Sequence, residues 1–345
     1  MMRVVVLPDE VRVVEAAAPE PGPGEAQLRM VVAGVCGSDT HALRGRHPNV
    51  HPPYAPGHEV VGVVTAVAAG VTSVRAGQRA TVEPDLPCWE CKQCRAGRQN
   101  LCERLGFFGC GSEQGGMAEV FTIDARRLHV VPEEFDDATA ALIEPLSTPV
   151  HAIRLAGGVR DRAVAILGVG TIGLLTLKVA RAQGARRIVV TARSARSRKR
   201  ALAFGADAAV DATAGDAADQ VRAALGESAD VVFDCVAEQS TTTQALAVAD
   251  KGGTVVVVGV PAGEVTIPLA LLQDSQLRIQ GSATYLPEDY ADAMTLLREQ
   301  VVTAADFVTA VHPLAGAAAA FADAESGEHI KVLVRSGSTG FDVMS

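Results

Sequence analysis

Short runs of apolar and β-branched residues alternate with helical patterns in the second half of the chain. Such runs occupy residues 163–167, 187–191, 230–234 and 254–258, and alanine-rich stretches with helical spacing separate them. Runs that are apolar on both faces are typical of strands buried on both sides of a parallel sheet. The alternation therefore predicts an α/β fold with a doubly wound parallel sheet.

The first of these runs leads into the glycine pattern Gly168-x-Gly170-x-x-Gly173, and a helical pattern follows it. Gly168 allows a tight turn, Gly170 lets a pyrophosphate approach the backbone, and Gly173 lets the helix pack closely on the strand. The unpaired N–H groups at the helix start would then face the phosphates. The pattern alone is weak, but its place between a strand and a helix predicts a dinucleotide-binding Rossmann unit; a glycine turn without a nucleotide is the alternative. We expect further cofactor contacts from Thr171, Ile172 and Val258.

The residue that ends the second strand of such a unit selects between NAD and NADP, because it faces the adenosine ribose. NAD-dependent proteins place an acidic residue there, whereas this chain has Ala192, followed by Arg193 and Ser194. A carboxylate would accept a hydrogen bond from the 2′-hydroxyl and repel a 2′-phosphate, and guanidinium groups favour the phosphate. The sequence therefore predicts NADP as the preferred cofactor, held at Ala192, Arg193, Ser194 and Arg198; a basic solvated helix face is the alternative interpretation.

Composition limits the classes of partner. A length of 345 residues suffices for two domains, and the formal net charge of −9 argues against nucleic acid or an anionic membrane as the main partner. No apolar run reaches the roughly 18 residues that span a bilayer, and the N-terminal segment has no signal-type apolar region. We expect a cytoplasmic protein that acts on small molecules.

Four of the seven cysteines form a compact pattern, which runs Cys88-x-x-Cys91-x-x-Cys94-x7-Cys102. This spacing lets four thiolates converge tetrahedrally on one zinc ion, and a reducing compartment keeps them available. Disulfides, or a zinc ribbon that binds nucleic acid, are the alternatives. Because the loop has few basic residues within an acidic protein, we expect a structural zinc.

A second set of ligand types lies upstream, in the segments that contain Cys36 and His58. A thiolate, an imidazole and a carboxylate are the donors of a catalytic zinc site, in which three protein ligands leave one position open. Taken singly, Cys36 could be a small core residue, His58 a hydrogen-bonded loop histidine, and Glu144 a carboxylate at a helix start.

Together these motifs resemble the zinc-dependent medium-chain dehydrogenase/reductase family. The matching segments are Cys-Gly-Ser-Asp-x-His at 36–41, Gly-His-Glu-x-x-Gly at 57–62, the four-cysteine lobe at 84–105, Glu-Pro-Leu at 144–146 and the glycine pattern at 168–173. The resemblance covers essentially the whole chain in the family's order. The Glu-Pro-Leu segment is similar to the sorbitol, threonine and butanediol dehydrogenase branch rather than to the alcohol dehydrogenases that have a cysteine there.

The resemblance implies a mainly β, GroES-like catalytic domain that the Rossmann domain interrupts. We expect the catalytic domain at 1–150, the NADP-binding domain at 151–281, and a return to the catalytic domain at 282–345, with the active cleft between the two domains. The segment 329–334 is similar to the closing strand of that return. Family members associate through strands of the cofactor domain, so we expect a homodimer or homotetramer, with residues 254–263 as the corresponding edge.

The resemblance also implies the roles of the site residues. Cys36, His58 and Glu144 would hold the catalytic zinc, and Glu59 would bind the metal directly, bind it through water, or support a ligand. Ser38 and His41 match the proton relay of the family, while a solvated helix histidine is the alternative for His41. The expected reaction is hydride transfer between an alcohol and the nicotinamide.

The substrate is less well defined by the sequence. Polyol dehydrogenases of the family tend to carry an aromatic residue after the relay histidine, where this chain has Ala42, and an arginine where it has Thr284 and Tyr285. A secondary alcohol or polyol, a diol, a modified cyclic sugar or an amino alcohol, or the corresponding ketone, therefore remains open. A nucleotide-binding regulatory protein without turnover and a zinc-independent quinone reductase are the alternatives, and the zinc ligands argue against both.

Overall fold

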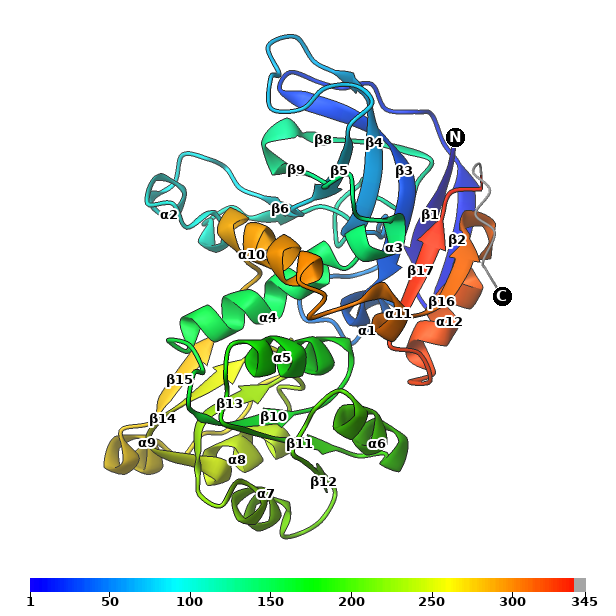
Figure 1. Ribbon diagram of the computed structural model, residues 1–345. Coiled ribbons are helices and arrows are strands. Elements are labelled where there is room, and N and C mark those ends of the chain that lie inside the picture. The colour runs from blue at the N-terminus through cyan, green and yellow to red at the C-terminus, as the bar shows by residue number, and fades with distance from the viewer. Residues whose placement is uncertain (338–345) are drawn as a thin grey trace. The chain divides into compact units, whose positions relative to one another are not determined.

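The structure, a computed structural model, describes residues 1–337 and contains two compact units (Figure 1). One unit comprises Met1–Glu144 together with the chain from Thr303 on, and the other comprises Pro145–Val302. Each unit has its own main sheet and its own core. The domain limits expected from the sequence, at residues 150 and 281, remain predictions.

The second unit is built on a sheet of six parallel strands, in the order β12-β11-β10-β13-β14-β15. Its strands are β10 (Ala163–Leu167), β11 (Arg187–Ala192), β12 (Ala208–Asp211), β13 (Ala229–Asp234), β14 (Ala249–Val257) and β15 (Arg278–Gly281). The strand order reverses direction next to β10, which is typical of a doubly wound dinucleotide-binding sheet. The predicted α/β class and parallel sheet are confirmed.

Helices of this unit cover both faces of its sheet (Figure 1). The helices of the unit are α4 (Ile143–Leu155), α5 (Thr171–Ala182), α6 (Ala195–Ala203), α7 (Ala217–Leu225), α8 (Gln239–Val248), α9 (Leu269–Ser275) and α10 (Pro287–Arg298), and α10 packs against α4 rather than against the sheet. In β10 all five side chains are buried, and Ala163, Ala165 and Leu167 pack in one cluster with residues of α7 and α8. Because strand side chains alternate, Val164 and Ile166 face the opposite side, where α5 lies.

The outer edge of this sheet differs from the expected one. The sequence predicts the edge at 254–263, but β14 pairs with β13 on one side and with β15 on the other. The last strand in the order is therefore β15. The short run Arg278–Gly281 has few apolar residues, so its sequence pattern does not identify it as a strand.

The first unit is mainly β, as predicted. Its seven-stranded sheet has the order β16-β17-β3-β4-β5-β9, and β8 pairs with β3 beside this path. The strands are β3 (Glu25–Val35), β4 (Glu59–Val67), β5 (Arg79–Val82), β8 (Val120–Asp124), β9 (Leu128–Val130), β16 (Val308–Pro313) and β17 (Lys331–Arg335). Two further pairs are β1 (Met2–Leu7) with β2 (Glu10–Glu15), and β6 (Asp85–Leu86) with β7 (Gly106–Phe107).

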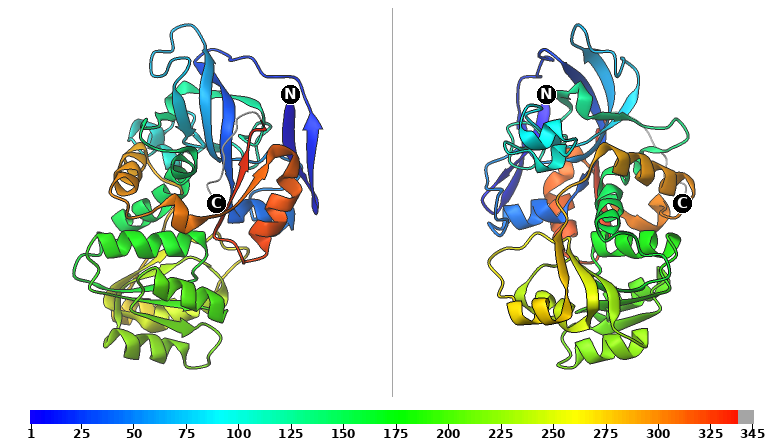
Figure 2. Two further views of the ribbon diagram at one scale, coloured as in Figure 1. Left: turned by 45° about the vertical axis from the view of Figure 1, so that its right-hand side comes forward. Right: turned by 90° about the vertical axis from the view of Figure 1, so that its left-hand side faces the viewer.

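The helices of this unit are short. They are α1 (Gly37–Leu43), α2 (Lys92–Arg95), α3 (Asp137–Ala140), α11 (Ala304–Phe307) and α12 (Ala317–Glu325), with 3₁₀ turns η1 (Gln99–Leu101), η2 (Ala125–Arg127) and η3 (Leu314–Gly316). The C-terminal segment returns to this unit, because β17 pairs antiparallel with β3 and α12 packs beside β2 (Figure 2). The segment expected at 329–334 is thus a strand, although it begins two residues later.

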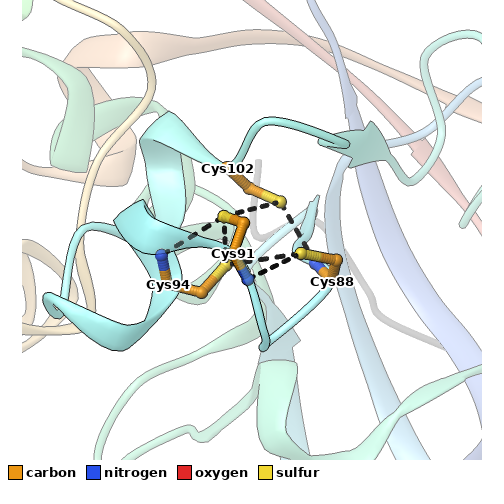
Figure 3. Close-up of side chains that lie close together, drawn as sticks. All are labelled: Cys88, Cys91, Cys94 and Cys102. Carbon is orange, nitrogen blue, oxygen red and sulfur yellow. Dashed lines mark hydrogen bonds between the residues drawn. The ribbon is translucent and has the colours of Figure 1, made fainter.

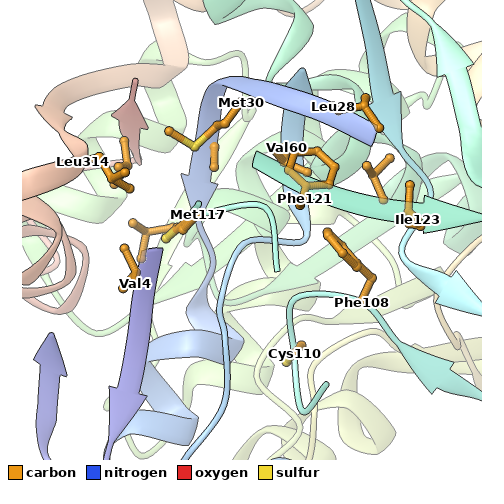
Figure 4. Close-up of a cluster of buried hydrophobic side chains, with 14 of the residues drawn as sticks. Val4, Leu28, Met30, Val60, Phe108, Cys110, Met117, Phe121, Ile123 and Leu314 are labelled. Atoms are coloured by element: carbon orange, nitrogen blue, oxygen red, sulfur yellow. The ribbon is translucent and has the colours of Figure 1, made fainter. Parts of the chain in front are cut away.

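The core of the first unit joins residues that lie far apart in the sequence (Figure 4). Phe108, Met117 and Phe121 pack with Met30 of β3 and Val4 of β1, and all five are at most 2% exposed. This core holds the loop around Phe108 against the sheet, and the same loop continues into the candidate site. None of the described helices is long and apolar enough to cross a membrane.

Candidate active site

The four cysteines of the predicted lobe converge on one point (Figure 3). The Sγ–Sγ distances are 3.5 Å for Cys91 and Cys94, and 3.9 Å both for Cys88 with Cys94 and for Cys91 with Cys102. Four thiolates at about 2.3 Å from a tetrahedral zinc ion lie about 3.8 Å apart. The spacing therefore fits a closed tetrahedral zinc site.

Backbone N–H groups support thiolate charge in this lobe. The amide of Cys91 donates to Cys88 Sγ at 3.4 Å, that of Cys94 to Cys91 Sγ at 3.5 Å, and that of Cys88 to Cys102 Sγ at 3.2 Å. A hydrogen bond from the Arg104 side chain lowers the pKa of Cys88 to about 6. A cysteine binds a metal ion as the deprotonated thiolate, so these hydrogen-bond donors favour the metal-bound form.

The second predicted ligand set also comes together. Cys36 precedes α1, and His58 and Glu59 lie at the start of β4, yet one ligand atom from each lies within 4.8 Å of the others. His58 is 3% exposed and Glu59 is 1% exposed. A thiolate, an imidazole and a carboxylate gathered in this way fit a zinc ion that keeps one coordination position open.

The electrostatics of this set favour a cation. Burial by itself would lower the pKa of His58, but the negative charges of Asp39 and Cys36 outweigh burial and raise the pKa well above its usual value. The imidazole therefore lies in a strongly negative local potential, in which a divalent cation is stabilised. This negative potential is a property of the chain's own side chains.

The carboxylate of Glu59 has a partner that no pattern in the sequence predicts. Lys331 Nζ, in β17, lies 2.6 Å from both oxygens of Glu59 and donates to Val35 O at 3.2 Å. Burial lowers the pKa of Lys331, but the charge and hydrogen bonds of Glu59, together with the charges of Cys36 and Glu144, outweigh burial, so the pKa is raised. Gly34 leaves the necessary space, because a Cβ there would lie 1.9 Å from Glu59 Oε2. The signal in the sequence was a single lysine within the apolar strand 331–334.

The other residues predicted for this site are Ser38, His41 and Glu144, and none of them belongs to the cluster of Cys36, His58 and Glu59. Ser38 Oγ lies 3.5 Å from His58 Nε2, at the outer limit of a hydrogen bond, and His41 is exposed on α1. Glu144 is buried in the first turn of α4 and adds to the negative charge that acts on Lys331. Its carboxylate is not among the ligand atoms that lie within 4.8 Å of one another. Zinc ligation by Glu144 and the relay through Ser38 and His41 remain predictions.

Four further residues near the ligand set, Phe107, Tyr54, Asp39 and Cys110, were given no role from the sequence. The ring of Phe107 meets the imidazole edge-on at a centroid distance of 5.6 Å. Tyr54 Oη donates to Asp39 Oδ1 at 3.1 Å, and the backbone amide of Cys36 donates to Asp39 Oδ2 at 3.1 Å. Burial raises the pKa of the Cys110 thiol to about 12. Isolated polar or aromatic residues carry no spacing pattern, so no local signal in the sequence assigns them to the site.

The glycine turn of the second unit has the geometry that its sequence predicts. Gly168 has a φ of +86°, and a Cβ on Gly173 would lie 2.0 Å from Gly168 O. Gly170, the N-cap of α5, has no atom within 4 Å of a Cβ position, so the approach to the helix start is open. Thr171 and Ile172 begin α5, and Val258 follows β14. A pyrophosphate fits this arrangement of backbone N–H groups.

The predicted 2′-phosphate residues differ in their availability. Ala192 ends β11 and is buried, whereas the Arg193 side chain is exposed and Ser194 caps α6 by accepting from Ser197 N. Arg198 is already engaged: its Nη1 donates to Ala192 O at 2.9 Å and to Arg193 O at 3.0 Å, and pairs with Asp211 at 3.0 Å. Arg198 thus supports the backbone at residues 192–193, while the guanidinium group of Arg193 is exposed and available to a 2′-phosphate.

The comparisons with known proteins agree with this geometry. Residues 22–133 match the model of the alcohol dehydrogenase GroES-like domain, and residues 171–299 match that of the zinc-binding dehydrogenases. The chain is 33% identical to "Probable D-xylulose reductase A" of Aspergillus clavatus, over 90% of this chain and 89% of that protein. It is 31% identical to the sorbitol dehydrogenase of Ovis aries, over 96% of this chain and 95% of that protein.

Solved structures show the same similarity. A zinc-binding dehydrogenase from Sinorhizobium meliloti 1021, described as bound to NADP, has a TM-score of 0.87 and 31% identity, with 97% of this chain and 98% of that chain covered. The 2R,3R-butanediol dehydrogenase from Bacillus subtilis has a TM-score of 0.87 and 25% identity, with 97% and 99% covered. The two metal-binding clusters and these likenesses identify the chain as a zinc-dependent, NAD(P)-dependent dehydrogenase of the medium-chain family, in its sorbitol dehydrogenase and xylulose reductase-like branch.

Proposed function

We propose that this protein transfers a hydride between a secondary alcohol or polyol, or the corresponding ketone, and NADP(H). The observation that carries the proposal is the convergence of Cys36, His58 and Glu59, three metal-ligand types that are buried and within 4.8 Å of one another. A protein that only binds nucleotide needs no such site, so the set favours an enzyme over a regulatory protein.

The chain's own residues would divide the work of this reaction. When bound, the zinc ion supplies a Lewis acid for the substrate oxygen, and the nicotinamide supplies the hydride acceptor. Cys36 and His58 hold the metal, and Asp39 orients the Cys36 backbone by accepting from its amide. Ser38 would accept the alcohol proton while it releases its own hydroxyl proton towards His41, and His41, exposed on the same helix, would release a proton to solvent. Lys331 neutralises Glu59 when that carboxylate does not bind the metal.

The preference for NADP rests on the end of β11. Ala192 offers no carboxylate there, and the exposed Arg193 side chain can donate two hydrogen bonds to a phosphate. The relative from Sinorhizobium meliloti is described as bound to NADP, which is consistent with this assignment. Ser194 contributes a hydroxyl at the start of α6, close in sequence to Arg193.

The substrate class rests on the relatives and on two local features. Relatives named for sorbitol, xylulose and butanediol favour a polyhydroxylated or vicinal substrate. Ala42 is small and fully buried, and Tyr285 is buried against Tyr290, so neither supplies a charged group for a sugar hydroxyl. A less polar secondary alcohol or diol is therefore favoured over sorbitol, and a modified cyclic sugar or an amino alcohol is the second candidate.

The assembly and the location complete the proposal. The edge strand β15 has partly exposed residues and directly follows α9, whose Leu269 is 76% exposed. An apolar surface next to an unpaired strand edge is suited to pairing with a second copy, so we propose a homodimer or homotetramer. The seven cysteines are all free, which is consistent with a reducing cytoplasm.

Steady-state turnover tests the proposal directly. The purified zinc-loaded enzyme is assayed with NADP⁺ and with NAD⁺ against a panel of secondary alcohols, diols, polyols and amino alcohols, and in reverse with the ketones. The expected result is turnover of a secondary alcohol with higher kcat/KM for NADP⁺. Tight nucleotide binding without turnover of any substrate would contradict an enzymatic role and favour the regulatory alternative.

A further inference from the structure

The first unit contains a cavity of about 530 Å³ that no part of the proposed reaction uses. Its wall combines apolar and polar groups, and residues 111–114 supply many of the polar ones. The apolar lining residues come from the N-terminal segment with β1, the chain after β2 and the loop before β4, and are Met1, Val5, Ala17, Pro19, Pro53 and Ala55. A volume of this size falls within the roughly 300–1,000 Å³ that is typical of small-molecule sites.

One guanidinium group lines this cavity, and it is incompletely bonded. Arg3 Nη1 donates to Glu113 O at 3.2 Å, while Arg3 Nε is buried and has no hydrogen-bond partner among the residues that the structure describes. Nε itself has almost no accessible surface, so a ligand in the cavity reaches this guanidinium through its terminal nitrogens. A carboxylate or phosphate accepts charge-assisted hydrogen bonds from such nitrogens.

The cavity therefore favours an organic anion with an apolar body. Its polar side chains other than Arg3 are mostly engaged within the wall, since Ser112 Oγ donates to Gln114 O and the Gln114 side chain bonds to Thr122. A carboxylate or phosphate at Arg3, with a ring or alkyl group against the apolar wall, would use both features. Glu113 also lines the cavity, and its carboxylate would oppose the anion by repulsion.

Two short hydrogen-bond chains connect this cavity to the candidate zinc ligands. Tyr54, which lines the cavity, donates to Asp39, and Asp39 accepts from the amide of Cys36. On the other side, Gly109 N donates to Gln114 O at 3.1 Å, and Gly109 O lies 3.4 Å from His58 Nδ1.

We propose that this cavity is an effector site for a small organic anion, a carboxylate or a phosphate monoester, that binds to Arg3. Occupation would order the 111–114 loop and Tyr54, and through them the segments that carry Cys36 and His58. The bound anion should therefore slow the loss of the catalytic zinc. Coupling of this kind requires that the anion bind the zinc-loaded state more tightly than the zinc-free state.

Calorimetric titration of the zinc-loaded enzyme tests the binding site. The probes are benzoate, phenyl phosphate and, as the neutral control, benzamide. We expect at least one of the two anions to bind to the wild type. Arg3→Gln should weaken this binding roughly tenfold or more, and Glu113→Gln should strengthen it. Comparison of the two anions identifies carboxylate or phosphate as the preferred group, and inorganic phosphate shows whether the apolar body is needed.

The results of these titrations distinguish anion binding at Arg3 from anion binding at the catalytic metal. Binding that persists in Arg3→Gln and disappears when the catalytic zinc is removed would place the anion at the metal and overturn the proposal, as would the absence of binding by either anion. Circular dichroism and thermal melting verify that Arg3→Gln is folded; if it is not, Glu113→Gln carries the test, and unchanged affinity in that variant overturns the proposal.

The rate of zinc release tests the coupling. A chelator and a colorimetric zinc indicator report release with and without the anion, independently of turnover. We expect the anion to slow release in the wild type, and Tyr54→Phe to bind the anion with affinity within roughly twofold of the wild type while losing much of the slowing. If the anion slows zinc release equally in Tyr54→Phe and in the wild type, the Tyr54 hydroxyl does not couple the cavity to the zinc ligands. No slowing in the wild type would overturn the effector role.

Discussion

Lys331 Nζ lies 2.6 Å from both carboxylate oxygens of Glu59, and the two side chains are 3% and 1% exposed. The pair joins β17, near the end of the described chain, to β4, which begins beside the candidate zinc ligand His58. Each charge compensates the other in a region that excludes water. The C-terminal return of the chain therefore contributes directly to the electrostatics of the site.

Removal of one member of the buried Lys331–Glu59 pair should destabilise the folded protein. We expect Lys331→Met to lower the free energy of unfolding by about 3–5 kcal/mol, because Glu59 would remain buried without its counter-charge. Urea unfolding followed by circular dichroism measures the change. The double variant Glu59→Gln/Lys331→Met should recover much of the loss, since no buried charge remains. A single variant as stable as the wild type would show that Glu59 is compensated by other groups.

The two zinc sites should differ in how easily they lose metal. The wild type should contain two zinc ions per chain, and mild chelation should abolish turnover before it affects the fold, because the site with an open position exchanges metal more readily than the closed four-cysteine site. Cys36→Ser should abolish turnover with little change in thermal stability.

Cys91→Ser is the matched control for this prediction, because it removes a thiolate of the closed site and should lower the melting temperature. Metal content, melting temperature and turnover are measured on the same samples. Full activity with a single tightly bound zinc ion would contradict the assignment of two sites.

Gly34 offers a test of the space around Glu59. A Cβ at Gly34 would lie 1.9 Å from Glu59 Oε2, so Gly34→Ala should displace the carboxylate and cost about 1–3 kcal/mol of stability. Gly37→Ala, three residues along the chain, adds a methyl group with nothing within 4 Å and is the matched control. Thermal melting compares the two variants. Equal stability of both would mean that the Glu59 side chain has other space available.

The sequence predicted those parts of the molecule that depend on local patterns. Gly168 and Gly173 have the geometry that their spacing requires, and the cysteines at 88–102 converge because a short loop brings its own ligands together. The buried strands of the parallel sheet could be predicted because each contains a short run of apolar residues, and β10 is apolar throughout.

The parts that could not be predicted depend on contacts between distant segments. Lys331 lies 272 positions from Glu59, and no pattern near either residue indicates the pair. The free edge of the sheet was misplaced because β15 is short and polar, whereas the stronger apolar run of β14 belongs to the interior. The engagement of Arg198 with backbone oxygens depends on the turn after β11, whose path the basic composition of α6 does not reveal.

The pH dependence of stability should reveal the lowered pKa of the Asp207 carboxylate. Burial would raise the pKa of Asp207, but hydrogen bonds from Ile188 N and from Arg181 outweigh burial and lower the pKa below its usual value. A lowered pKa in the folded state stabilises the protein above the unfolded pKa of about 3.9, and this stabilisation is lost as the pH falls through the lower, folded value.

Asp207→Asn should therefore be less stable than the wild type at neutral pH, and the difference should shrink as the pH falls from about 5 to about 3.5. Urea unfolding at several pH values measures this difference, and Asp250→Asn, at an exposed position, is the control. A difference that does not depend on pH would mean that the Asp207 carboxylate keeps its ordinary pKa.

The choice of cofactor should depend on Arg193. If the 2′-phosphate lies against Arg193 and Ser194, kcat/KM with NADP⁺ should exceed that with NAD⁺ by at least about tenfold, because charge-assisted hydrogen bonds contribute about 1.5–3 kcal/mol. Arg193→Ala should raise the KM for NADP⁺ and leave that for NAD⁺ nearly unchanged, since NAD⁺ makes no use of that charge.

The double variant Ala192→Asp/Arg193→Ala should reverse the preference, because the new carboxylate accepts from the ribose 2′-hydroxyl and repels the phosphate. Lys199→Ala, which removes an exposed charge from the neighbouring helix α6, is the control and should leave the ratio unchanged. Arg198→Ala should instead weaken both cofactors, since the loop over 192–193 loses the side chain that holds its carbonyl groups. Equal kcat/KM with the two cofactors in the wild type would contradict the assignment of NADP and leave the basic residues of α6 as a solvated surface.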